Sequence, residues 1–329
     1  MNIELEITFQ SYVFLTILVL IEKIKDVELE GNFMSITSFI VKRMFVRGDK
    51  KRDKDLVLPE NISTISDITY GPDKKWQCLD VHQPKNRRQK LPTIINIHGG
   101  AWVYGDKKIY APYCMNLAEA GFAVINASYR LAPNHHFPAQ IEDVALIVQW
   151  VLDHAEDYQL DLDNLFMIGD SVGAQLAAMY CCICLNPSYR KEFPVLAKYK
   201  KIVPKALVLN CGLYEMASAM SKKDSFLPKL LKDLLGQKAQ EQDLQQLSPL
   251  FHLTKDFPPC YVMTGNQDFL REQSYLLRDV FLDLGVSFQF RDHGTECEPQ
   301  SHVFHLDLRN PVGNQCRQEE IAFLQSYVS

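Results

Sequence analysis

The sequence of 329 residues predicts an α/β fold in which a mostly parallel central sheet is flanked by helices on both faces. Short, continuously apolar runs recur from about residue 60, and stretches with helical spacing separate them. Runs without polar alternation are typical of strands buried on both faces, as in parallel sheets. Glycine-rich and polar segments directly follow several of these runs, at the sheet edge where α/β proteins gather their functional groups.

Eight runs are expected to form strands, in the order Ile65–Tyr70, Gln77–His82, Thr93–Ile97, Ala123–Ser128, Leu165–Ile168, Ala206–Leu209, Cys260–Met263 and Ser287–Arg291. Helices are expected over roughly Ile141–His154 and at the C-terminal end over Gln318–Tyr327. Residues 212–250 interrupt the alternation with a Lys-, Leu- and Gln-rich helical pattern. We interpret this segment as a helical cap over the site, with a remote surface excursion as the alternative.

Residues 1–58 are expected to form an N-terminal helical segment, as part of the cap or as an extension, and residues 59–329 the main domain. The apolar run Tyr12–Ile21 has ten residues, whereas a membrane-spanning helix needs roughly twenty. A buried or interfacial helix is the expectation, with weak membrane-surface contact as the alternative. Residues 34–58 begin with a helical pattern and become highly charged, which predicts a solvated connector.

The composition is that of a globular protein with an ample core, because 47% of the residues are hydrophobic and 23% are charged. The net charge of −5 argues against nucleic acid as a main partner, since phosphate binding needs clustered Lys and Arg. The nine cysteines show no zinc-site spacing with matching histidines. We expect reduced, mostly buried thiols in a cytoplasmic protein, no metal ion, and an oligomeric state that the sequence leaves open.

The motif Gly169-Asp170-Ser171-Val172-Gly173 directly follows one expected strand and precedes the helix start Ala174–Ala178. A serine between two glycines at a strand-to-helix turn is the signature of a nucleophile elbow. The glycines let the chain turn sharply, and the turn lifts the serine hydroxyl above the sheet. This context makes Ser171 the candidate nucleophile.

The motif His98-Gly99-Gly100-Ala101-Trp102 directly follows the expected strand Thr93–Ile97. Acyl transfer places negative charge on a carbonyl oxygen, and fixed backbone N–H groups stabilise that charge. We assign the donors to Gly100 and Ala101 together with the N–H of Val172, and Gly99 is the weaker fourth candidate. His98 is expected to brace this loop rather than to act as a base.

Together with Ser128-Tyr129-Arg130-Leu131-Ala132-Pro133 and Phe137-Pro138-Ala139, these motifs resemble the hormone-sensitive-lipase-like esterases over roughly residues 65–328. Within that group, the sequence is most similar to the microbial acetyl-esterase type. The resemblance implies an α/β-hydrolase fold with a helical cap. It also implies a serine carboxylesterase that hydrolyses short-chain acyl esters through an acyl-enzyme, without a cofactor. Ala101 replaces the usual third glycine and Val172 the usual alanine, and both changes narrow the expected site.

The remaining members of a catalytic triad should follow in the order acid, then histidine. Asp268 comes just after the expected strand Cys260–Met263 and is the candidate acid, whereas Asp279 and Asp283 have the spacing of a solvated helix face. The resembling family places its base in an H-x-F context, which Ser301-His302-Val303-Phe304 matches. His302 is therefore the candidate base, with His305 and His293 as alternatives.

The substrate is expected to be a small-molecule ester. Trp102, Tyr104 and Tyr214 are candidates for its pocket, with core packing as the alternative for each. Arg130 and Asp143 are expected to pair internally. An arylformamidase-like amide hydrolase, a non-catalytic binding relative and a lipase are the functional alternatives that the same motifs leave open.

Overall fold

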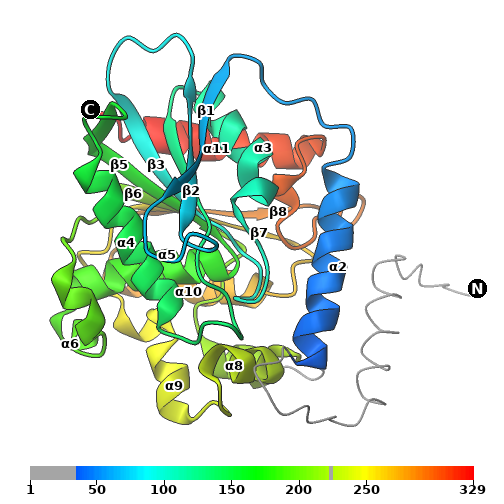
Figure 1. The fold of residues 1–329 in the computed structure, drawn as a ribbon. Coiled ribbons are helices and arrows are strands. Elements are labelled where there is room, and N and C mark those ends of the chain that lie inside the picture. Colours follow the sequence, from blue (N-terminus) through cyan, green and yellow to red (C-terminus); the bar gives the residue numbers. More distant parts are fainter. Residues whose placement is uncertain (1–34, 222–224) are drawn as a thin grey trace, which may run out of the picture.

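The computed structural model describes residues 35–221 and 225–329, and an eight-stranded sheet runs through its centre (Figure 1). The sheet order is β1-β2-β4-β3-β5-β6-β7-β8. Strands β1 and β2 pair antiparallel with each other, β2 pairs antiparallel with β4, and all further pairs are parallel. The predicted mostly parallel sheet is thus confirmed. The strands are β1 Ile62–Thr69, β2 Cys78–Pro84, β3 Leu91–Ile97, β4 Ala123–Ala127, β5 Leu160–Asp170, β6 Ala206–Asn210, β7 Cys260–Gly265 and β8 Phe288–His293.

Every expected apolar run coincides with a strand, because continuous burial is what a central strand requires. All residues of β4, β6 and β7 are buried. The edge strand β1 instead carries mostly exposed or half-buried residues. The strand ends differ from the expected ones by a few residues, since polar residues at the ends still take part in ladder hydrogen bonds.

Helices cover both faces of the sheet and enclose two hydrophobic cores. The helices α4 Ala139–Asp153, α5 Val172–Leu185 and α10 Arg271–Leu284 bury their apolar residues on one face. The helices α3 Lys107–Glu119 and α11 Pro311–Gln325 bury theirs on the other. Helix α11 begins seven residues before the expected start at Gln318, because the Asn310 side chain caps it and Pro311 occupies its first turn.

A third apolar cluster joins the segment 212–250 to the end of the sheet that carries the candidate site. This segment contains α7 Met216–Ser221, α8 Leu227–Leu235 and α9 Glu241–Gln246. Helix α2, Ile36–Arg52, lies beside α8 (Figure 1), and the Ser35 N–H donates to Asp233 at 3.1 Å. The remaining short elements are α6 Pro187–Arg190, η1 Pro194–Lys198, η2 Pro249–His252 and η3 Phe304–Leu306.

The predicted solvated connector is confirmed for most of the charged run, because Lys50, Lys51 and Lys54 are exposed, but helix α2 continues as far as Arg52 and two of its charges are largely buried. The Asp49 and Arg52 side chains are only 23% and 14% exposed and form an ion pair at 2.9 Å. The i,i+3 spacing places both charges on the helix side that faces the protein. The apolar run Tyr12–Ile21 lies outside the described residues, and no helix in the described ranges is long and apolar enough to cross a membrane.

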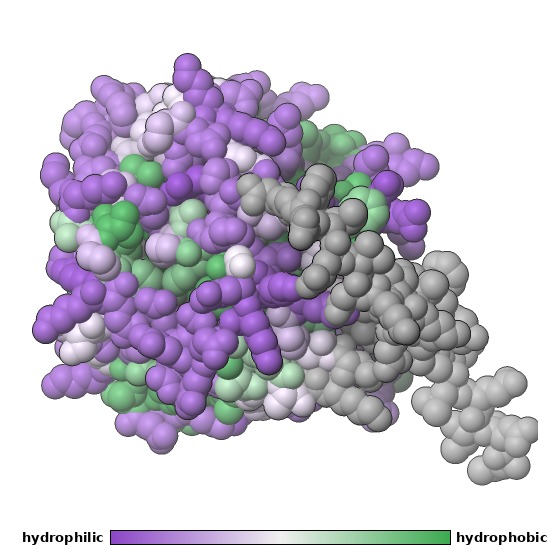
Figure 2. Space-filling model, turned by 60° about the horizontal axis from the view of Figure 1, so that its bottom comes forward, coloured by the Kyte–Doolittle hydropathy of each residue, from purple (hydrophilic) through white to green (hydrophobic). Residues whose placement is uncertain are grey.

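The nine cysteines form no disulfide, and most are buried, as expected. Figure 2 shows a mostly hydrophilic face, on which apolar residues form small groups between charged side chains.

Candidate active site

Ser171 sits in the sharp turn from β5 into α5, with φ +52° and ψ −121°. Its N–H donates to the Asn210 carbonyl of the neighbouring strand at 2.8 Å, which fixes this unfavourable backbone conformation. Gly169 and Gly173 must be glycines, because other backbone atoms lie too close to leave room for a Cβ at either position. A Cβ at residue 169 would lie 2.4 Å from the Gly173 backbone, and one at residue 173 would lie 2.1 Å from the Ile97 carbonyl oxygen.

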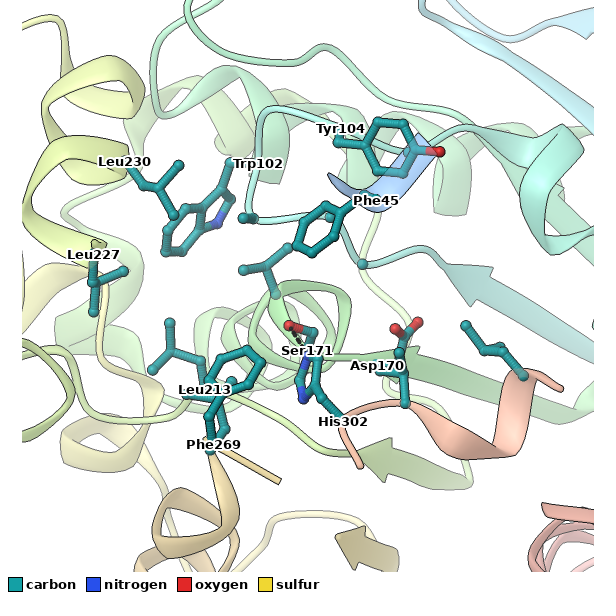
Figure 3. Close-up of a pocket in the computed structure, with 18 of the residues that line it drawn as sticks. Phe45, Trp102, Tyr104, Asp170, Ser171, Leu213, Leu227, Leu230, Phe269 and His302 are labelled. Carbon is teal, nitrogen blue, oxygen red and sulfur yellow. Dashed lines mark hydrogen bonds between the residues drawn. The ribbon is translucent and has the colours of Figure 1, made fainter. Parts of the chain in front are cut away.

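The structure brings Ser171, His302 and Asp268 into one hydrogen-bonded line. The Ser171 Oγ lies 3.0 Å from His302 Nε2 (Figure 3). On the other side of the ring, His302 Nδ1 lies 2.8 Å from Asp268 Oδ1. Asp268 Oδ1 also accepts the Leu270 N–H at 2.8 Å, and Oδ2 accepts the Thr264 hydroxyl at 3.1 Å. A histidine that donates through Nδ1 leaves Nε2 free to accept a proton from the serine.

The rival acids and bases lie elsewhere. Asp279 and Asp283 are exposed on α10, as their spacing indicated. His293 contacts the Tyr261 hydroxyl at 3.4 Å. His305 is fully buried edge-on against the Tyr113 ring, where burial lowers its pKa well below the ordinary value. None of these four side chains lines the cavity beside Ser171.

The loop after β3 bends through Gly100 at φ +119° and Ala101 at φ +53°. A side chain at residue 100 would collide with the Tyr104 carbonyl, 2.1 Å away. Within the described residues, the N–H groups of Gly100, Ala101 and Val172 donate no hydrogen bond. Gly99 differs, because its N–H donates to the Tyr110 hydroxyl at 2.9 Å and is therefore not available to a substrate oxygen.

His98 braces this loop, as predicted. Its Nδ1 lies 2.7 Å from the Gly99 carbonyl, and its ring stacks on Tyr129 with centroids 4.1 Å apart. Burial lowers the His98 pKa to about 4, so the ring is neutral near pH 7. Arg130 pairs internally, also as predicted, with the buried carboxylate of Asp143 at 2.7 Å.

A cavity of about 230 Å³ opens beside Ser171 and has two different sides. Figure 3 shows apolar side chains on the side of helix α8, and an aromatic ring and a carboxylate on the opposite side. The apolar side consists of Trp102, Val172, Leu213, Leu227, Leu230 and Phe269. The polar side consists of Asp49, Arg52, Tyr104 and Asp170, and the apolar ring of Phe45 lies on the same side.

Two of the three expected pocket residues line this cavity. Trp102 does so while its indole N–H donates to Gln175 at 3.0 Å, and Tyr104 donates to Asp49 at 2.7 Å. Tyr214 does not, which corrects the prediction. Its side chain is fully buried in the core beneath the site, whereas the preceding residue, Leu213, faces the cavity.

The BD-FAE family profile matches residues 79–280, which is more than half of the chain. The chain belongs to the BD-FAE family of α/β-hydrolase carboxylesterases. It is 26% identical to esterase LipQ of Mycobacterium tuberculosis over 208 residues, which cover 62% of this chain and 48% of LipQ. It is 27% identical to an acetyl esterase of Salmonella paratyphi A over 197 residues, 56% of this chain and 58% of that protein. The chain spans about half the length of the first curated relatives that it matches.

Among solved structures, esterase B of Lactobacillus rhamnosis HN001 superposes with a TM-score of 0.79 at 26% identity. The match covers 88% of this BD-FAE family chain and 95% of esterase B. The α/β-hydrolase fold therefore extends beyond the range of the family profile.

In this BD-FAE family member, the sequence left open whether residues 1–58 join the cap, and it did not identify the α2 residues that line the cavity. Phe45, Asp49 and Arg52 belong to no motif, and their position depends on the packing of α2 against α8. Sequence reasoning also missed Asp170, although this residue lies inside the recognised motif. Its buried carboxylate faces the polar side of the cavity.

Two carboxylates flank the nucleophile and differ in their pKa. Burial alone would raise the pKa of Asp268, but the His302 charge and several hydrogen bonds outweigh it and hold the pKa below its ordinary value. Burial raises the pKa of Asp170 to about 6, although the Tyr110 hydroxyl and the charges of His302 and Arg52 oppose the shift. Asp268 is therefore the carboxylate suited to stabilise a protonated imidazole.

One group in the described part of the chain has the residue types and spacing for a metal ion: Cys211, Asp268 and His302, with ligand atoms within 4.8 Å of one another. A metal ion at this position would compete with the proton that His302 donates to Asp268.

Proposed function

We propose that the protein is a serine esterase that cleaves short-chain carboxylic esters through an acyl-enzyme on Ser171. The observation that carries this proposal is the line from Ser171 through His302 to Asp268, next to three unengaged N–H groups. In this proposal Ser171 is the nucleophile, His302 the general base and acid, and Asp268 the residue that orients the imidazole.

The reaction would begin when His302 Nε2 removes the Ser171 proton and Oγ attacks the ester carbonyl carbon. The N–H groups of Gly100, Ala101 and Val172 would stabilise the negative oxygen, because they are fixed in place and bound to no protein acceptor. His302 then gives its proton to the leaving alcohol oxygen as the C–O bond breaks. Water, activated by the same imidazole, would release the acid, so the reaction needs neither a metal ion nor an organic cofactor.

We propose acyl chains from acetyl to about butyryl. The apolar side of the cavity can take a hydrocarbon chain, while Val172 and Leu213 narrow it close to the nucleophile. The relatives support this range, because one is named an acetyl esterase and esterase B has been solved with a C4-C4 tributyrin phosphonate. On the same grounds we propose that α2 acts as part of the cap, since Phe45 reaches the cavity. The unpaired cysteines support a cytoplasmic location.

Turnover of a panel of p-nitrophenyl esters from acetate to octanoate tests the proposal, and an N-formyl anilide serves as the amide substrate for comparison. We expect the highest kcat/KM between acetate and butyrate and a far lower value for the anilide. Ser171→Ala should abolish turnover and labelling by a fluorophosphonate. Faster turnover of the anilide than of every ester would instead indicate the amide hydrolase, and an unreactive Ser171 would indicate a binding protein.

A further inference from the structure

Tyr110, on α3, lies between the two chain segments that are proposed to form the oxyanion hole. Its hydroxyl oxygen accepts the Gly99 N–H at 2.9 Å, and its O–H donates to Asp170 Oδ2 at 2.8 Å. Gly99 immediately precedes the donors Gly100 and Ala101. Asp170 immediately precedes Ser171. One phenol thus connects the end of β3 to the end of β5.

We propose that Tyr110 is a positioning residue that holds the two halves of the oxyanion hole at their working separation. The hole needs the Gly100 and Ala101 amides from one strand end and the Val172 amide from another. Donors must lie within about 2.7–3.1 Å of the developing oxyanion. A small change in the distance between the Gly100–Ala101 segment and Val172 would therefore weaken the stabilisation of the oxyanion. This inference rests on the proposed esterase function.

The surroundings of Tyr110 leave the bridge little freedom. Its ring is buried, and a Cβ at residue 99 would lie 2.6 Å from Asp170 Oδ2 and 3.1 Å from the Tyr110 hydroxyl. The other bonds that hold the loop act on carbonyls, because His98 contacts the Gly99 oxygen and Tyr129 contacts the His98 oxygen. The His98 carbonyl and the Gly99 N–H belong to one planar peptide unit, so Tyr129 and Tyr110 hold this unit from its two sides. Of these two hydroxyls, only that of Tyr110 also bonds Asp170 within the described residues, and so ties the unit to the end of β5.

Tyr113 provides a matched control on the same helix. It is as buried as Tyr110, and its hydroxyl donates to the buried carboxylate of Glu320 at 2.7 Å rather than to the loop after β3. Tyr113→Phe therefore removes a hydroxyl-to-carboxylate bond of the same kind. It removes no hydrogen bond to the segments that carry Gly100, Ala101 or Val172. Glu320 keeps its other bond, which it accepts from the Asn210 side chain at 2.8 Å.

The experiment compares Tyr110→Phe with Tyr113→Phe, using p-nitrophenyl acetate turnover, thermal unfolding and the affinity for a trifluoromethyl ketone. The serine adds to this ketone to give a tetrahedral oxyanion, so the affinity for the ketone measures directly how well the oxyanion hole stabilises that charge. For Tyr110→Phe we expect kcat to fall roughly tenfold to a hundredfold, less than the ~10²–10³ reported for complete loss of a donor. We expect KM to stay within about twofold and ketone affinity to fall in parallel with kcat.

For Tyr113→Phe we expect a similar loss of thermal stability, with kcat and ketone affinity within about twofold of the parent. Equal losses of kcat in both variants would overturn the inference, because they would reflect general core damage. So would an unchanged kcat in Tyr110→Phe. A parent enzyme that neither cleaves esters nor binds the ketone would overturn the proposed function itself, which is a separate outcome.

Discussion

Replacing Asp268 with Asn separates the charge of the acid from its geometry. Oδ1 accepts two N–H groups, from His302 and from Leu270, each at 2.8 Å, whereas Oδ2 accepts the Thr264 hydroxyl. The introduced amide should place its oxygen at the Oδ1 position, because its NH₂ group there would face two donors. The Thr264 hydroxyl can rotate to accept the NH₂ group. His302 would keep its tautomer, with Nε2 free to accept the Ser171 proton.

The expected cost is then the lost attraction between a carboxylate and the imidazolium that forms in the transition state. Two unit charges about 4 Å apart attract by about 4 kcal/mol at an effective dielectric constant near 20. This energy corresponds to a loss of roughly 10³-fold in kcat. Asp268→Ala also removes the oxygen that orients His302, so its kcat should be lower than that of Asp268→Asn by about tenfold or more.

The assay is steady-state hydrolysis of p-nitrophenyl acetate by both variants, with Ser171→Ala as the background and thermal unfolding to verify folding. A kcat for Asp268→Asn equal to that of Asp268→Ala would refute the reasoning. It would mean that the amide does not hold the imidazole in the inferred orientation.

Three further predictions concern stability and specificity. Burial raises the pKa of Glu320 from 4.5 to about 7, so the folded protein binds this proton more tightly than the unfolded chain. The free energy of unfolding should therefore fall by about 3 kcal/mol as the pH rises from about 4.5 to 7. Glu320→Gln should reduce this fall in urea titrations at several pH values, and an unchanged slope would contradict it. Leu230→Phe, on the apolar side of the cavity, should lower kcat/KM for butyrate relative to acetate by about tenfold, and an unchanged ratio would place the acyl chain elsewhere. Asp143→Ala should lower the free energy of unfolding by about 1–3 kcal/mol in urea titrations, because it removes the buried carboxylate that bonds Arg130 and leaves Arg130 paired with Glu142 alone among the described residues; a loss below about 0.5 kcal/mol would show that the pair contributes little.

Local signals predicted the parts of the site that depend on local physics. The turn at Ser171 needs glycines two residues away on each side, and that requirement is visible in the chain itself. The buried strands are visible because most residues of the central strands are apolar, although Asn96, Asn126 and Asn210 are buried in them as well. Asp268 could be chosen because it directly follows a parallel strand, at the edge of the sheet where such loops open. The choice of His302 came from the H-x-F context of the family that the sequence resembles.

The cavity walls could not be predicted in this way. Leu213 and Tyr214 are neighbours of similar hydrophobicity, and only the packing of the segment after β6 turns one toward the cavity and the other into the core. Asp49 and Arg52 belong to a charged run typical of a solvated surface, yet they are largely buried by contacts with the rest of the chain.

The sequence by itself determined the sheet, the nucleophile turn and the order of the candidate catalytic residues, because each follows from residue types within a few positions of one another. Tertiary structure alone decided which side chains line the cavity beside Ser171 and which hydroxyl bonds the Gly99 N–H. Those contacts join residues distant in sequence, such as Gly99 with Tyr110 and Asp170. Their energies depend on distances that no local pattern encodes.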